Sequence, residues 1–80
     1  MANSITVYSK PNCVQCTATK KDLEKKGLAF DEVDITKDHD ALMFVLGLGH
    51  QSAPVVVVGD DSWGGFQPAK IAALAAAQAA

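Results

Sequence analysis

The feature that most constrains the fold is a cysteine pair, Cys13 and Cys16, which lies between a strand-like segment and a helical pattern. Apolar and polar residues alternate over 5–8, a proline–asparagine pair breaks that run, and a helical pattern starts near Val14. A thiol in the first helical turn lies among amide N–H groups without intrahelical partners, at the positive end of the helix dipole. Both conditions favour the thiolate, which is the attacking species. A C-x-x-C pair in a βαβ-like setting is therefore typical of a redox dithiol.

Three other interpretations of this pair compete with thiol–disulfide exchange. A zinc site needs about four ligands, and His39 and His50, the other soft candidates, do not have a finger-like spacing. A static disulfide would close a very small loop, which restricts the unfolded chain little, and iron–sulfur ligation would need further thiols. Thiol–disulfide exchange is favoured because the pair lies between a strand and a helix. Cys13, expected to be more exposed, is then the attacking thiolate, and Cys16, one turn on and more buried, resolves the mixed disulfide.

Length and charge restrict the possible classes of protein. Eighty residues predict a single domain, 1–80, with a small core. A net charge of −2 gives no basic footprint for nucleic acid, and no apolar run approaches the roughly 20 residues of a membrane span. Residues Met1–Ser4 lack a charged start and an apolar signal core, so we expect a cytoplasmic protein. Cysteines there are normally reduced, which favours catalysis or metal binding over a structural bridge. We also expect a monomer.

The remaining pattern predicts an α/β fold in the order β-α-β-α-β-β-α. Strands are expected at 5–8, 28–35, 54–58 and 62–63, and helices at 14–26, about 41–46 and from 68 onward. Strands separated by helices imply parallel pairing, and the short turn near 59–61 implies an antiparallel hairpin. Gly27 ends the first helix, Gly47 and Gly49 end the second, and Ala75–Ala80 continues the last helix and then frays. Apolar residues lie at helical spacing in the second helix, at Ala41, Leu42, Val45 and Leu46. The residues expected to face inward are Val14, Ala18 and Leu23 in the first helix and Ile71, Leu74 and Ala75 in the last.

Pro54 stands at the start of the buried strand, where a proline cannot donate to the ladder. Two conformations fit: an ordinary trans proline, or a cis Ala53–Pro54 bond in a tight turn. A cis turn would lie against the dithiol and leave the Ala53 backbone free to pair with a substrate strand. Beside the dithiol, Lys10 either stabilises the thiolate or is simply solvated. Val14 and Gln15 bring neither positive charge nor proline, so we predict a reducing couple.

Three segments, 8–16, 53–56 and 63–68, resemble the NrdH-redoxin family of glutaredoxin-like proteins, and the similarity extends over nearly the whole chain. The resemblance implies a thioredoxin-like fold with a four-stranded mixed sheet and three helices, a cis Pro54, and a redox-active Cys13–Cys16 pair without a bound cofactor. It also implies reduction by thioredoxin reductase using NADPH, and electron transfer to class Ib ribonucleotide reductase for deoxyribonucleotide synthesis. The candidate partner-binding residues are Lys10, Val14, Gln15, Ala53, Pro54, Trp63, Gly65 and Phe66.

A glutathione-dependent glutaredoxin is the main alternative, and a non-catalytic binding module is a third. In glutaredoxins, acidic residues come directly after a Gly-Gly pair and hold the ammonium group of glutathione. Here Gly64 and Gly65 are followed by Phe66-Gln67-Pro68, which contains no carboxylate side chain. A missing charge-assisted hydrogen bond would cost about 1.5–3 kcal/mol. Efficient use of glutathione is therefore not expected.

The chain also departs from the NrdH pattern. The family commonly has Ser, Arg and Asp where this chain has Gly64, Gln67 and Ala69, which bears on affinity for partners more than on chemistry. Trp63 and Phe66 allow two interpretations, a docking patch beside Cys13 or the cover of a small core.

Overall fold

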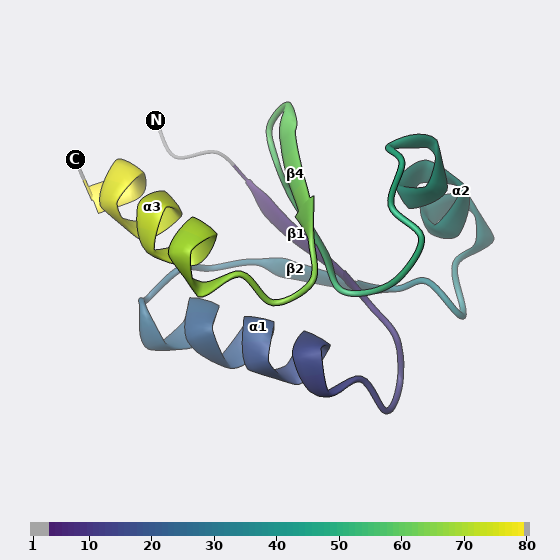
Figure 1. Ribbon diagram of the computed structural model, residues 1–80, viewed down its shortest axis with the longest axis horizontal. Coiled ribbons are helices and arrows are strands. Elements are labelled where there is room, and N and C mark those ends of the chain that lie inside the picture. The colour runs from purple at the N-terminus through teal and green to yellow at the C-terminus, as the bar shows by residue number, and fades with distance from the viewer. Residues whose placement is uncertain (1–3, 80) are drawn as a thin grey trace.

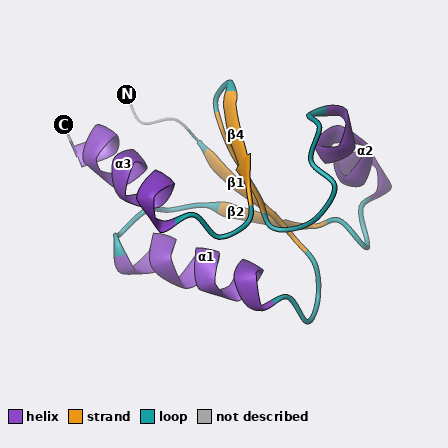
Figure 2. Cartoon of the chain, viewed as in Figure 1, coloured by secondary structure: helices purple, strands orange, loops and turns teal. Residues whose placement is uncertain are grey.

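The computed structural model describes residues 4–79, which form a four-stranded mixed sheet with helices on both faces (Figures 1 and 2). Helices α1 and α3 lie against one face and α2 lies on the other (Figure 1). The predicted order of strands and helices is confirmed. The elements are β1 (Ile5–Ser9), α1 (Val14–Lys25), β2 (Asp31–Asp34), α2 (His39–Gly47), β3 (Val55–Val58), β4 (Asp61–Gly64) and α3 (Pro68–Ala79).

The register of the strands brings four strand ends to one edge of the sheet. The spatial order is β2-β1-β3-β4, with Ser9 opposite Asp34, Tyr8 opposite Val55, and Val55 opposite Gly64. The ends of β1, β2 and β4 therefore meet the start of β3. The segments that follow β1, precede β3 and follow β4 must lie close together at this edge.

The direction of β3 corrects one expectation. Parallel pairing across a helix holds for β1 and β2 but is wrong for β3, which runs antiparallel to β1. The chain leaves β2 at Asp34 and enters β3 at Val55, and both residues lie at the same edge. The connection through α2 thus returns the chain to the edge it left, whereas a parallel crossover must carry it to the opposite edge.

The core on the α1 and α3 side follows the alternation of the strands. Side chains of one parity, such as Val7, Val56 and Trp63, pack there against Leu23 and Ile71. Side chains of the other parity face α2, where the rings of Tyr8 and Phe44 lie 5.7 Å apart. As expected, Ile71 is buried, and Leu74 and Ala75 pack against the same cluster.

One inward-facing prediction is wrong. Val14 is 85% exposed, and the buried side chains of α1 are instead Cys16, Thr19 and Leu23. These three residues are spaced by three and four positions and therefore form one buried stripe along the helix. Val14, in the first turn, lies outside this stripe. In α2, Ala41 and Val45 form the buried side of the short helix, and Leu46, although at helical spacing with them, is 43% exposed.

The end of α1 explains why β2 starts later than predicted. Gly27 has φ +71° and donates its N–H to Glu24 O, while Leu28 donates to Leu23 O, the pattern of a Schellman motif. Leu28 is thus part of the helix cap, and pairing with β1 begins only at Asp31.

The predicted limits of the other helices and strands are mostly close to the observed ones. The residue at which α2 ends is Gly47, and Gly49 takes the positive φ beyond it. Pro54 precedes β3 instead of opening it. Pro68 begins α3, which continues to Ala79. The expectations for Met1–Asn3 and Ala80 concern residues outside the described range. No helix within residues 4–79 is long and apolar enough to cross a membrane.

Candidate active site

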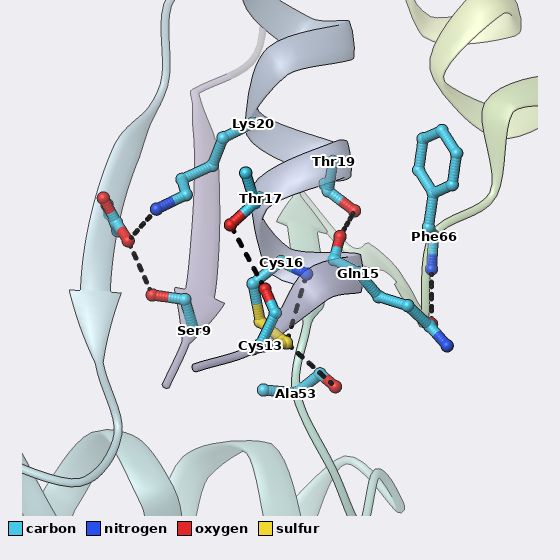
Figure 3. The surroundings of a disulfide bond; sticks show 10 residues. Ser9, Cys13, Gln15, Cys16, Thr17, Thr19, Lys20, Ala53 and Phe66 are labelled. Atoms are coloured by element: carbon cyan, nitrogen blue, oxygen red, sulfur yellow. Dashed lines mark hydrogen bonds and ion pairs between the residues drawn. A yellow bond between two sulfur atoms is a disulfide. The ribbon is translucent and has the colours of Figure 1, made fainter. Parts of the chain in front are cut away.

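The cysteine pair occupies the start of α1. Asn12 adopts φ +57°, a conformation that asparagine tolerates, and turns the chain from the end of β1 into the helix. Cys13 is the N-cap residue, and its Sγ accepts a hydrogen bond from the Cys16 N–H at 3.1 Å (Figure 3). Cys13 and Cys16 form a disulfide, with their Cα atoms 5.2 Å apart. An amide that points at Cys13 Sγ stabilises negative charge there after reduction.

The two sulfur-bearing residues differ in exposure. Both cysteines line an open pocket, but Cys16 is 1% exposed, whereas Cys13 is half-buried. An external disulfide can therefore approach Cys13 but not Cys16. The geometry fits the predicted roles of Cys13 as the attacking residue and Cys16 as the resolving residue.

The turn before β3 lies against the disulfide. The Ala53–Pro54 peptide bond is cis, as the resemblance implies, and Ala53 O is 4.0 Å from Cys13 Sγ (Figure 3). Pro54 is buried, and the Ala53 N–H has no hydrogen-bond partner within residues 4–79. An N–H beside the reactive sulfur is thus available to pair with another backbone.

The segment after β4 completes this surface. Gly65 donates its N–H to Pro54 O at 2.8 Å, and Phe66 donates its N–H to Gln15 Oε1 at 3.2 Å (Figure 3). The Phe66 side chain is 36% exposed. Trp63 does not belong to this surface: it is 6% exposed and packs in the core, because its position in β4 faces α1 and α3. Of the two interpretations of Trp63, the structure supports the core role and corrects its assignment as a partner-binding residue.

An open pocket of about 650 Å³ extends from the disulfide along α1 and β2. Lys10 lines it and makes no ion pair or hydrogen bond within the described range. In the same lining, Glu32 Oε2 accepts hydrogen bonds from Lys20 and Ser9, each at 2.7 Å. These bonds hold the pKa of Glu32 below its usual value. Sequence reasoning missed this polar group, although the charged residues in the imperfect alternation of 28–35 indicated a partly polar strand.

The described side chains do not supply a metal centre. No group of three or more His, Cys, Asp or Glu residues within residues 4–79 is arranged to hold an ion. His50 instead has Nε2 3.0 Å from Ser62 Oγ. The zinc interpretation of the cysteine pair therefore finds no support in the arrangement of the described residues.

The sequence of this chain is similar to a known protein family and to curated proteins. Residues 5–63 match the glutaredoxin family model. The glutaredoxin-like protein NrdH of Salmonella typhimurium is 45% identical over 65 residues, which cover 81% of this chain and 80% of that protein. NrdH of Lactococcus lactis subsp. lactis is 41% identical over 71 residues, which cover 89% of this chain and 99% of that protein.

A solved structure shares the fold. The NrdH-redoxin of Escherichia coli, a glutaredoxin-like protein described as having a thioredoxin-like activity profile, superposes with a TM-score of 0.85 at 38% identity. The superposition covers 89% of this chain and 93% of that one. The predicted thioredoxin-like fold is confirmed by this similarity and by the strand order.

Proposed function

The chain belongs to the glutaredoxin family, within its NrdH group, and from this membership we propose that it carries electrons from thioredoxin reductase to a class Ib ribonucleotide reductase. As a glutaredoxin-like NrdH protein with its cysteine pair in place, it is a thiol–disulfide oxidoreductase. The proposal concerns the two partners, the use of NADPH through the reductase, and the site residues.

The exchange proceeds in two steps. The Cys13 thiolate attacks one sulfur of the partner disulfide, so that the partner S–S bond breaks, a mixed disulfide forms and one partner thiolate leaves. The Cys16 thiolate then attacks Cys13 Sγ and releases the second partner thiolate. Two electrons have passed to the partner, and the Cys13–Cys16 disulfide remains. Thioredoxin reductase would reverse this change with the two electrons of NADPH.

The observation that carries the choice of reductant is the absence of carboxylate side chains beyond Asp61 in this sequence. The first turn of α3, which follows the Gly64–Gly65 pair, contains no acidic residue. The ammonium of glutathione would therefore lack a charge-assisted partner there. This favours a protein reductase over glutathione.

One residue favours the alternative function. Lys10 lines the pocket beside Cys13 with its ammonium free of ion pairs within the described range, and a cation in that place can bind a glutathione carboxylate. Glutathione-dependent activity is therefore the second candidate, weaker because only one end of glutathione would be held.

Reconstitution with the acceptor tests the proposal. Class Ib ribonucleotide reductase is incubated with NADPH, thioredoxin reductase and this protein, and deoxyribonucleotide formation is measured. We expect turnover that requires all three, and none when Ser replaces Cys13. Product formation no faster than in the mixture without this protein would refute its role as electron donor.

A further inference from the structure

We propose that Gln15 is a positioning residue whose side-chain amide holds the Gly65–Phe66 segment in place for the docking of protein disulfides. The inference rests on the proposed function and deepens it, because it assigns the substrate class of the same site: a cysteine presented on an extended protein segment. Direct contact with a partner, the role first expected for Gln15, is a different role and predicts different mutant behaviour.

Three segments far apart in the sequence form a closed set of contacts, the three-segment network. Cys13 Sγ approaches Ala53 O at 4.0 Å, Pro54 O accepts the Gly65 N–H at 2.8 Å, and the Phe66 N–H donates to Gln15 Oε1 at 3.2 Å. The network closes because Cys13 and Gln15 lie at the start of the same helix. In Figure 3 the Gln15 side chain extends from α1 toward the Phe66 backbone.

Gly65 gives a second, independent indication of this packing. Its φ is +78°, and a Cβ atom built there would lie 3.3 Å from Gln15 Oε1. The backbone of the segment therefore lies directly on the Gln15 amide, without an intervening side chain. Glycine satisfies both the positive φ and the close approach.

The network determines the relative positions of the groups that an extended substrate would meet. Around Cys13 these are the Ala53 N–H, which is unpaired within residues 4–79, the exposed Val14 side chain and the partly exposed Phe66 ring. A protein segment that pairs with the Ala53 backbone and covers the Val14 and Phe66 side chains contacts all three groups at once. Binding is tighter when these groups are already held in place, because ordering a mobile segment on binding costs affinity. A small disulfide that reacts at Cys13 covers less of this surface.

The expected effect is moderate. The bond between Phe66 N–H and Gln15 Oε1 is exposed to solvent, so its loss should change protein-disulfide reactivity by about three- to tenfold. The fold and the dithiol remain, and the change should appear as a difference between substrate classes.

Three substitutions separate positioning from direct contact. Gln15→Glu keeps an acceptor oxygen at the same reach, Gln15→Asn keeps the amide but is one methylene too short, and Gln15→Leu keeps the size but removes the acceptor. Gln51→Leu makes the same chemical change at an exposed glutamine without a hydrogen bond in the described range. Each pre-reduced variant is mixed with oxidised insulin or with bis(2-hydroxyethyl) disulfide. Its oxidation is followed by rapid alkylation and mass spectrometry, and exchange of the Phe66 amide is followed by NMR.

We expect Gln15→Leu and Gln15→Asn to lower the ratio of the insulin rate to the small-disulfide rate by about three- to tenfold, with faster exchange of the Phe66 amide. Gln15→Glu should keep the wild-type ratio and amide protection, and Gln51→Leu should change neither. Equal slowing in both reactions, or a ratio kept by Asn and lost by Glu, would overturn the proposal. Because the assay contains no reductase, a failure of the proposed electron source would leave this result interpretable.

Discussion

At the scale of single residues, the difference between the two cysteines follows from their places in the helix. Cys13 is the N-cap and stays half-buried, while Cys16 falls on the buried stripe of α1 with Thr19. One turn of helix thus separates an accessible sulfur from an inaccessible one. This difference was predictable from sequence, because it needs only the helix start and the period of the helix.

The same difference predicts the outcome of trapping. Cys16→Ser should accumulate a stable mixed disulfide between Cys13 and a protein disulfide substrate, because no second thiol remains to release it. Cys13→Ser should accumulate little, since Cys16 is 1% exposed. Non-reducing gel electrophoresis followed by peptide mass spectrometry measures both. Equal or greater trapping through Cys16 would reverse the assignment of roles.

The polar group formed by Ser9, Lys20 and Glu32 in the lining of the pocket was not predictable from the residues alone. Lys20 and Ser9 meet at Glu32 only because β2 pairs in parallel with β1 and because α1 brings Lys20 to the same carboxylate. Nothing local to Glu32 distinguishes it from the solvated acids nearby. The sequence contained the residues, and the tertiary structure created the contact.

At the scale of helices and strands, the type of each segment was predictable and some boundaries were not. Hydrophobic periodicity and glycine positions place all three helices and four strands in the right order. The start of β2 was misplaced because Leu28 closes the Schellman motif of α1, and the burial of Val14 was overestimated because residue type alone does not fix a helix face. Both errors come from tertiary contacts that override a local preference.

Two glycines at helix ends provide a matched test of this description. Gly27 has φ +71° and Gly47 lies within α2, and a Cβ at either would meet no heavy atom within 4 Å. Gly27→Ala should therefore destabilise the protein by about 1 kcal/mol through backbone conformation alone. Gly47→Ala should stabilise it by about 0.4–1 kcal/mol. Urea unfolding measures both, and a shift of the same sign for the two variants would contradict the assigned helix ends.

At the scale of the whole molecule, the site exists because the sheet brings three connecting segments to one edge. The C-x-x-C segment follows β1, the Ala53–Pro54 turn precedes β3, and the Gly65–Phe66 segment follows β4. The general rule of parallel pairing across helices would have placed β3 in the opposite direction and its start at the far edge. The family resemblance predicted the correct grouping of these segments, whereas the order of strands and helices alone did not.

The central claim is that this dithiol is reduced by a protein reductase in preference to glutathione. The direct measurement is NADPH oxidation coupled to insulin reduction, with thioredoxin reductase in one series and with glutathione plus glutathione reductase in the other. We predict that the first system is faster by at least about tenfold, the effect of one missing charge-assisted hydrogen bond to glutathione. Comparable rates in the two systems, or a faster rate with glutathione, would contradict the account.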